Sequence, residues 1–249
     1  MMTLEEEADS LFLTDLSLTD SDCLDTARAD CADCLRPVTV CWCPHLPSPR
    51  IEVATKVIVL QHPGELKRNI RTCRMLELGL APQCVTVSVG RKFPGTEQAL
   101  SVALSQPGTR LLYPGPEAQP LDSLQAGEVT TLVLLDGTWE QARKLYSRNP
   151  AVQRLGKVSL SVAGPSLYVV RTQPNSACLS TLEAAVHSLA LLEDRPEIVE
   201  PLLAPLLAMC NVQINHGAVS HHDRELKQQA ARFRQENRDF KKRKPQFRK

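Results

Sequence analysis

The stretch VTTLVLLDGTWEQARKLYS, residues 129–147, decides the fold class of this chain. Residues 129–135 form an apolar, β-branched run without alternation, which is typical of a strand buried on both faces. A turn at Asp136-Gly137 follows at once, and we predict a helix over residues 138–148. A helix directly after a doubly buried strand indicates an α/β fold, in which helices cover both faces of a mostly parallel sheet.

Strands and helices alternate on both sides of this stretch. We predict further strands at residues 56–61, 84–90, 109–113, 157–162 and 167–171. We predict further helices at residues 62–80, 97–105, 178–193 and 196–210. Open sheets of this kind bind ligands beyond the carboxyl ends of their strands, so we expect the site in the loops at residues 114–118, 136–139 and 173–179. The absence of a G-x-G-x-x-G motif argues against a Rossmann-type domain.

Length and composition are those of one catalytic domain with tails. At 249 residues and 43% apolar content, the chain can bury one sizeable core. No apolar run approaches the roughly 18 to 20 residues of a membrane span, and the N-terminus is acidic where a signal peptide is basic. We therefore expect a soluble protein of the nucleus, the cytoplasm or both, without a membrane partner. Its nine cysteines are then expected to stay reduced.

The two ends of the chain carry opposite charge. Residues 1–30 contain nine Asp or Glu against one Arg, whereas residues 224–249 contain eleven Lys or Arg against three acids. We predict an acidic disordered tail at 1–30 and a basic helix or tail at 224–249. The basic cluster Lys241, Lys242, Arg243 and Lys244 suits RNA phosphates or nuclear import, the alternative being solvated tails without a specific role. Aromatic residues, at 4%, are too few for a base-stacking platform.

Four cysteines within residues 31–48 predict a metal site. Cys31, Cys34, Cys41 and Cys43 form a C-x2-C pair and a C-x-C pair separated by a turn. Four thiolates make the closed tetrahedral site of structural zinc, which keeps no open position for a substrate. The alternative is a group of buried or redox-labile thiols. The other cysteines are scattered singly, and we interpret most of them as small buried hydrophobes.

The motif Asp136-Gly137-Thr138-Trp139 is the leading candidate for a functional site. It lies where the buried strand gives way to a helix, so a carboxylate and free backbone N–H groups meet at the ligand-binding edge. The structural alternative is an ordinary Asp-Gly turn with Thr138 as the helix cap. Residues 178–183, CLSTLE, are expected at the same edge, although their capping-box spacing explains them structurally as well.

Four further residues are candidates for acid/base chemistry or RNA contact. His62 and Glu65 follow the first strand and could form an acid/base pair. The alternative is a histidine whose hydrogen bonds are satisfied beside a helix cap. Arg143 and Lys144, on the helix after Trp139, complete this group.

A family resemblance rests on the cysteine quartet followed, in order, by QHPGE, GRKF, LLYPG, DGTWEQA and CLSTLE. Over roughly residues 31–217 the chain resembles the DTW-domain tRNA-uridine aminocarboxypropyltransferases, and we assign the catalytic domain to residues 49–223. The resemblance implies that the 3-amino-3-carboxypropyl group of S-adenosylmethionine is transferred to N3 of a uridine in the tRNA D-loop, which forms acp3U. It also implies a SPOUT-like fold whose knotted loop holds the cofactor.

The resemblance also implies the roles of individual residues. Its catalytic core is Asp136, Thr138 and Trp139, where Asp136 acts either as a general base or as a group that positions the cofactor. The implied cofactor-binding residues lie on three loops and are Tyr113, Pro114, Gly115, Asp136, Gly137, Thr138, Trp139, Cys178, Leu179, Ser180 and Thr181. The expected partners are tRNA and S-adenosylmethionine, with zinc as a structural metal, and no protein partner is indicated.

Two other functions stay open at this point. A SPOUT-like RNA methyltransferase would use the same fold and cofactor but transfer the methyl group. A non-catalytic zinc-containing RNA-binding adaptor would need the cysteines and the basic tail but not Asp136. The identity of the group added to tRNA distinguishes the methyltransferase from the aminocarboxypropyltransferase. Tight binding of S-adenosylmethionine counts against the adaptor.

Overall fold

The computed structural model describes residues 29–68, 70–162, 164–171 and 178–219. Nearly all of the predicted acidic tail and the whole basic tail, Lys241, Lys242, Arg243 and Lys244 included, lie outside the described residues. Most of the predicted ligand loop at 173–179 lies outside them too. The knotted path that the resemblance implies stays a prediction.

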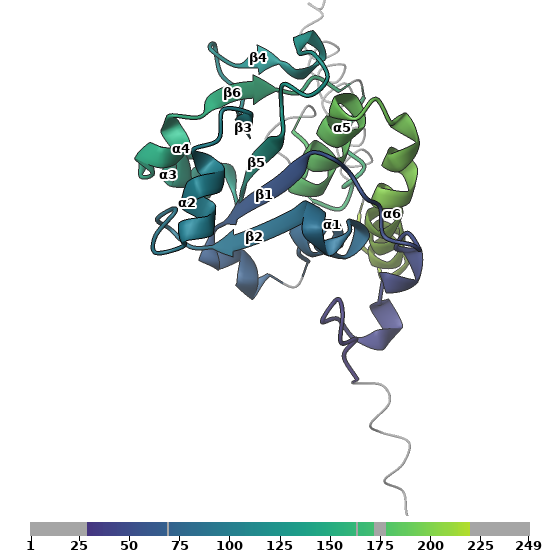
Figure 1. The fold of residues 1–249 in the computed structure, drawn as a ribbon. Helices are drawn as coiled ribbons and strands as arrows, with labels where there is room; N and C mark the ends of the chain where they lie inside the picture. Colours follow the sequence, from purple (N-terminus) through teal and green to yellow (C-terminus); the bar gives the residue numbers. More distant parts are fainter. Residues whose placement is uncertain (1–28, 69, 163, 172–177, 220–249) are drawn as a thin grey trace, which may run out of the picture.

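A parallel sheet forms the centre of the molecule, as predicted (Figure 1). Its six strands run in the order β2-β1-β5-β3-β6-β4, and every pairing is parallel. β5 lies between β1 and β3, and most of its residues are buried on both faces. The strands are β1 Lys56–Gln61, β2 Val85–Val89, β3 Thr109–Leu112, β4 Gln119–Pro120, β5 Thr131–Asp136 and β6 Gly156–Ser159.

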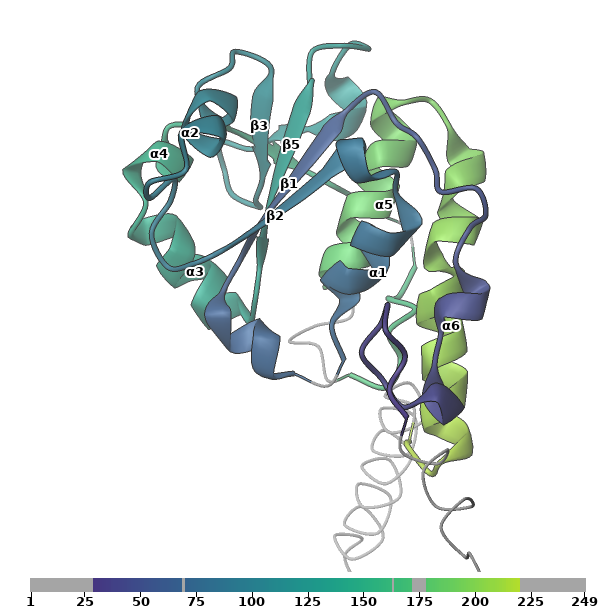
Figure 2. The same ribbon diagram turned by 60° about the horizontal axis from the view of Figure 1, so that its bottom comes forward.

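Helices cover both faces of this sheet, which confirms the predicted class. Figure 2 shows α2, α3 and α4 on one side of the sheet, and α1, α5 and α6 on the other. Alternate strand residues point to the two layers: Leu132 and Leu134 join the core under α1, α5 and α6, whereas Val133 joins the core under α2, α3 and α4. The helices are α1 Thr72–Gly79, α2 Gln98–Leu104, α3 Trp139–Ser147, α4 Pro150–Gln153, α5 Thr181–Leu192 and α6 Val199–Asn215.

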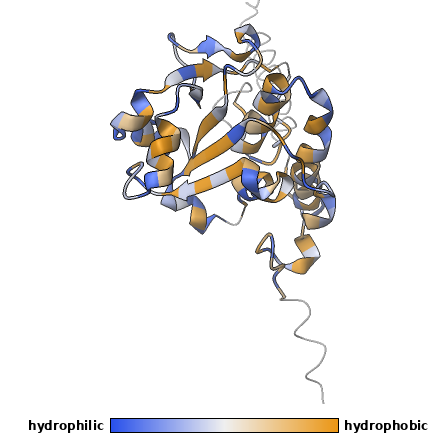
Figure 3. Ribbon diagram, in the orientation of Figure 1, coloured by the Kyte–Doolittle hydropathy of each residue, from blue (hydrophilic) through white to orange (hydrophobic). Residues whose placement is uncertain are grey.

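The cysteine segment packs onto the same core. It contains two short 3-10 helices, η2 (Val38–Val40) and η3 (Cys43–His45), and η3 contacts α6. Cys34 and Trp42 are buried in the apolar cluster formed with α1, α5 and α6. Figure 3 shows mostly hydrophobic residues along the central strands and a mixture of hydrophobic and hydrophilic residues along the helices. The segment therefore adds apolar surface to this side of the domain.

The 3-10 helix η7 (Pro196–Ile198) and α6 are together long and apolar enough to cross a membrane by length and composition. The sequence had led us to expect no such segment. In the structure α6 packs against α1 and α5, and its Leu202, Leu203, Leu206 and Met209 are buried. Of the apolar window, 39% is buried inside the domain.

Two predicted elements are wrong in the structure. The helix predicted over residues 62–80 is divided into the 3-10 helix η4 (Pro63–Lys67) and α1. Residues 167–171 form turns rather than a strand, because the buried Glu183 carboxylate accepts the Leu167 N–H at 2.6 Å and the Ser166 hydroxyl at 2.8 Å. These bonds hold the segment in a turn over the start of α5.

The register of the sheet brings the predicted motifs to one edge. β1 pairs with β5 so that Gln61 lies opposite Asp136, and β1 pairs with β2 so that Gln61 also lies opposite Val89. The His62 N–H then donates to the Asp136 carbonyl at 2.9 Å, which keeps the two chains together beyond the strands. The carboxyl ends of these strands thus meet as the parallel-sheet rule predicts.

A buried asparagine fixes the loop after β2 against the end of α3. Asn149 Oδ1 accepts the Phe93 N–H at 2.6 Å, while its Nδ2 donates to the carbonyls of Leu145 at 2.6 Å and Arg91 at 3.2 Å. Its side chain is only 2% exposed, so water does not replace these bonds. Asn149 therefore sets where Arg91 lies relative to α3.

We predict that Asn149→Ala lowers the free energy of unfolding by about 2–3 kcal/mol, because buried backbone groups lose their partners. The matched control is Gln153→Ala. Gln153 also donates to two carbonyls, those of Tyr146 and Ser147, but it is exposed, so its loss changes the free energy by less than about 0.5 kcal/mol. Urea denaturation followed by circular dichroism measures both, and equal effects would contradict the role of burial.

Candidate active site and metal centre

Asp136 ends β5 and ties three elements together. Its side chain is 6% exposed. Oδ2 accepts from Gln61 Nε2 of β1 at 2.7 Å, and Oδ1 accepts from the Thr181 hydroxyl at the start of α5 at 2.5 Å. Because hydrogen bonds to a carboxylate are short and strong, this residue holds the start of α5 against the edge of the sheet.

The turn after Asp136 begins α3 with a capping box. The Thr138 hydroxyl accepts the Gln141 N–H at 3.2 Å, and Gln141 Oε1 accepts the Thr138 N–H at 2.7 Å. A Cβ at Gly137 would lie 3.0 Å from the Gln141 side chain, so a larger residue would crowd this box. The helix-capping role that the sequence suggested for Thr138 is confirmed.

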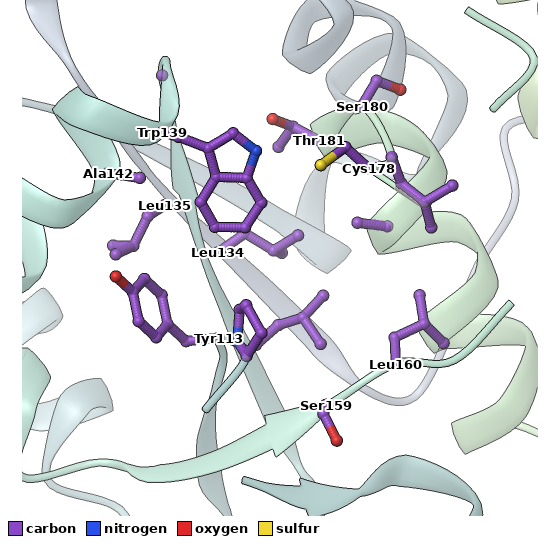
Figure 4. Close-up of a pocket in the computed structure, with 15 residues that line it drawn as sticks. Tyr113, Leu134, Leu135, Trp139, Ala142, Ser159, Leu160, Cys178, Ser180 and Thr181 are labelled. Atoms are coloured by element: carbon purple, nitrogen blue, oxygen red, sulfur yellow. The ribbon is translucent and has the colours of Figure 1, made fainter. Parts of the chain in front are cut away.

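A cavity of about 380 Å³ opens beside this turn at the carboxyl edge of the sheet. In Figure 4 the Trp139 ring points into it, with Tyr113 and Leu160 below and Thr181 with Cys178 beside it. The described lining contains no Asp, Glu, Lys or Arg. The lining residues are Leu112, Tyr113, Pro114, Leu134, Leu135, Gly137, Trp139, Ala142, Ser159, Leu160, Cys178, Leu179, Ser180, Thr181 and Ala184.

Most of the predicted cofactor-binding residues line this cavity. Eight of them do so, namely Tyr113, Pro114, Gly137, Trp139, Cys178, Leu179, Ser180 and Thr181. Gly115, Asp136 and Thr138 are not part of its lining: Asp136 is buried behind it and Thr138 caps α3. Three loops far apart in the sequence are therefore brought together as predicted.

Tyr113 lines the cavity and stacks on Tyr146 of α3. The rings of Tyr113 and Tyr146 are 4.8 Å apart at an interplanar angle of 13°. Lys157 Nζ lies 5.3 Å from the Tyr146 ring centre, and its ammonium group also pairs with Glu117 at 3.3 Å. This stacking fixes the Tyr113 ring at the cavity. Sequence reasoning singled out Tyr113 but not its partner, because no spacing rule connects residues on different elements.

His62 and Glu65 point to different surroundings. His62 Nδ1 accepts the Gly64 N–H at 3.0 Å, while Glu65 is 5% exposed and pairs with Arg68 Nε at 2.9 Å. Burial lowers the pKa of His62, with Arg91 adding to the effect, and burial raises the pKa of Glu65, with the charge of Asp136 adding to it. The described hydrogen bonds join no side-chain atoms of His62 to those of Glu65.

Arg143 and Lys144 lie exposed on α3. Lys144 pairs with Glu140 at 2.6 Å and lines a second cavity together with His62. Arg143 lines neither cavity. Of the four residues predicted for acid/base chemistry or RNA contact, the structure thus brings two together.

The four predicted cysteines gather into one cluster. Their sulfur atoms all lie within 4.8 Å of one another, with Cys31 Sγ 3.7 Å from Cys43 Sγ and Cys34 Sγ 3.6 Å from Cys41 Sγ. Four sulfurs bound at 2.3 Å around a tetrahedral zinc ion are about 3.8 Å apart, so this arrangement fits the metal. Backbone N–H groups, that of Cys34 above all, lower the pKa of Cys31 to about 7, which favours the thiolate that zinc requires, whereas burial raises the pKa of Cys41 and that of Cys43.

The fold and the site define a class: an α/β protein with an apolar ligand cavity at the carboxyl edge of a parallel sheet and a four-cysteine metal centre. A family model described as "DTW domain" matches residues 28–214. The chain therefore belongs to the DTW-domain family.

Three relatives agree with this assignment. The chain is 46% identical over 203 residues to tRNA-uridine aminocarboxypropyltransferase 2 of Drosophila melanogaster, which covers 80% of each chain. It is 39% identical over 195 residues to tRNA-uridine aminocarboxypropyltransferase 2 of Mus musculus, covering 77% of this chain and 65% of that relative. It is 28% identical to tRNA-uridine aminocarboxypropyltransferase A of Arabidopsis thaliana, covering 75% of this chain and 81% of that relative. No solved structure matches the chain.

We predict about one zinc ion per chain. Cys31→Ser with Cys34→Ser removes two ligands and should abolish zinc binding and lower the melting temperature by about 5–10 °C, since a closed thiolate site contributes directly to folding. Elemental analysis and thermal melting measure these effects. The control Cys84→Ala changes a buried cysteine outside the cluster and should keep the zinc. Carefully prepared protein without zinc would refute the assignment.

We predict that Glu65→Gln stabilises the protein more at pH 7 than at pH 4. The pKa of Glu65 is raised, so folding favours its protonated form, and that contribution is lost as the pH rises through the folded-state pKa. Glutamine resembles the protonated form at every pH. The control Glu197→Gln should show the opposite trend, because the Arg195 hydrogen bond lowers the pKa of Glu197. Denaturant titrations across this range test both, and a pH-independent difference for Glu65→Gln would contradict the prediction.

Proposed function

We propose that this protein is a tRNA-uridine aminocarboxypropyltransferase that transfers the 3-amino-3-carboxypropyl group of S-adenosylmethionine to N3 of a uridine in the tRNA D-loop, forming acp3U. The observation that carries the proposal is the apolar cavity at the DGTW turn of a DTW-domain chain. The names of three relatives support the reaction class. The tRNA is then the acceptor substrate, and the reaction requires no membrane.

The cavity suits a nucleoside-containing cofactor. Its volume of about 380 Å³ falls within the roughly 300–1,000 Å³ of small-molecule sites, which are mostly apolar with a few polar groups. Trp139 and Tyr113 offer ring faces, and such faces attract cations. Ser180 and Thr181 add hydroxyl groups at the start of α5. S-adenosylmethionine would supply a sulfonium that activates the transferred carbon, and these residues would hold and orient it.

We assign Asp136 a positioning role rather than that of a general base. Both of its carboxylate oxygens accept hydrogen bonds within the protein, from Gln61 and from Thr181. A base needs a lone pair directed at the proton it removes, and this buried carboxylate is not among the residues that line the cavity. Asp136 therefore fixes the position of Thr181 and of the residues before it. A displacement of about 1 Å of such groups can lower a rate by about 10²-fold.

The cysteine cluster has a structural role in this proposal. Four thiolates saturate a tetrahedral zinc ion, so a metal-bound water or substrate is not part of the reaction. A methyltransferase would use the same cavity, and the names of the relatives favour transfer of the aminocarboxypropyl group. A non-catalytic adaptor gives no reason for the cavity. We further propose that the protein acts in the nucleus, the cytoplasm or both.

The reaction is tested by incubating the purified full-length protein with labelled S-adenosylmethionine and unmodified tRNA, followed by mass spectrometry of the nucleosides. The expected product is acp3U at a D-loop uridine. A methylated uridine would assign the methyltransferase function. Tight binding of the cofactor without any product would count against both transferase functions, and binding of tRNA without the cofactor would favour the adaptor.

We predict that Asp136→Ala lowers acp3U formation by about 10²-fold and weakens cofactor binding, because the start of α5 loses its anchor. Thr181→Val removes the same hydrogen bond from the other side and should produce part of both effects. The matched control Asp122→Ala removes an exposed acid far from the cavity. Calorimetry measures cofactor binding, and nucleoside analysis measures the rate. A normal cofactor affinity with a rate that recovers as the pH rises would instead assign Asp136 as the base.

A further inference from the structure

A second cavity, of about 520 Å³, lies against a different face of α3 from the first. Trp139 and Ala142 face the first cavity, whereas Gln141, Leu145 and Arg148 face the second. Helical spacing of three and four residues produces these two stripes. His62 after β1 and Arg91 after β2 complete the second cavity, which therefore also lies at the carboxyl edge of the sheet.

The lining of the second cavity is cationic. Arg91, Lys144 and Arg148 contribute three positive charges, and Glu140 is the one acid among the described lining residues. Lys144 is paired with Glu140 at 2.6 Å. The ion pairs found in the described part of the chain involve neither Arg91 nor Arg148. Two guanidinium groups with free donors thus face one hollow, an arrangement that suits the oxygens of a phosphate.

His62 adds a donor to this cavity. Its Nδ1 accepts the Gly64 N–H at 3.0 Å, so the neutral ring carries its proton on Nε2. Burial lowers the pKa of His62, and the charges of Arg91 and Lys144 lower it further. The ring is therefore an uncharged N–H donor near neutral pH, in surroundings that repel cations. An anion placed in the cavity would relieve that repulsion.

Hydrogen bonds hold the main chain of both arginines in place. Asn149 binds the carbonyl of Arg91 at 3.2 Å and that of Leu145 at 2.6 Å. Arg148 is the C-cap of α3, and its N–H donates to the Lys144 carbonyl at 3.1 Å. The loop after β2 and the end of α3 therefore hold the backbones of the two arginines beside one cavity, which both side chains line.

We propose that the second cavity binds a backbone phosphate of the RNA whose target base enters the first cavity. This inference rests on the proposed function. The two cavities are separated by α3, whose diameter with side chains is about 10–12 Å. The bound phosphate therefore lies about one helix diameter from the target base. Arg91, Arg148 and His62 are the donors, and this phosphate fixes which nucleotide reaches Trp139.

The test is direct binding of unmodified tRNA to the full-length protein at several salt concentrations. Arg91→Gln with Arg148→Gln should weaken binding about tenfold and flatten the slope of log affinity against log salt by about 1, since phosphate contacts release counterions. Cofactor affinity should not change, because neither arginine lines the first cavity. The matched control Arg154→Gln removes an exposed arginine that lines a different cavity near the amino ends of the strands, and it should leave binding unchanged.

A second readout is the NMR titration of His62, whose pKa should rise when tRNA binds. Wild-type affinity and salt slope in the double arginine variant would overturn the proposal. So would saturation of the cavity by inorganic phosphate without competition against tRNA, because that result assigns the cavity to a free anion. The proposed function fails separately: wild-type protein that makes no acp3U, while the double variant still loses tRNA binding, refutes the reaction and keeps the phosphate site.

Discussion

The parallel pairing of β1 with β5 is the constraint on which the rest of the site depends. It places Gln61 opposite Asp136 and lets the Gln61 amide bind the carboxylate at 2.7 Å. A buried carboxylate is unfavourable unless hydrogen bonds replace its hydration, and the Thr181 hydroxyl supplies the second bond at 2.5 Å. The same bond joins α5 to the sheet. Asp136 is therefore required for the shape of the cavity before any chemistry is considered.

The cysteine cluster concerns a different part of the structure, the segment before β1. The segment before β1 has only short 3-10 helices, so its backbone hydrogen bonds alone hold it weakly. Yet it buries Trp42, 3% exposed, on the core under α1, α5 and α6. A metal ion bound by the four thiolates would restrict this segment at one point and keep the indole ring in place. The cysteine segment thus completes the covering of one face of the sheet.

Sequence patterns predicted the class of fold and most of the first cavity. The doubly buried strand at 131–136 and the rule for parallel sheets together bring Tyr113, Trp139 and Cys178 to one edge. The turn at 167–171 was missed because its Val169-Val170 pair resembles a strand, and the deciding bond comes from Glu183, which is distant in the sequence. The second cavity was missed because local patterns do not give the strand order that brings Arg91 to α3.

The charges of the two cavities follow from the chemistry each has to serve. In the proposed function, apolar walls with few polar groups would strengthen the electrostatic attraction between a sulfonium and the ring faces of Trp139 and Tyr113. An RNA phosphate, in contrast, needs charged donors that stay hydrated until it binds, as exposed arginines do. Because both cavities lie along α3, the two stripes of this helix must differ in polarity. In the sequence WEQARKLYSR, Trp139 and Ala142 face the first cavity, whereas Lys144 and Arg148 face the second and Arg143 is exposed to solvent.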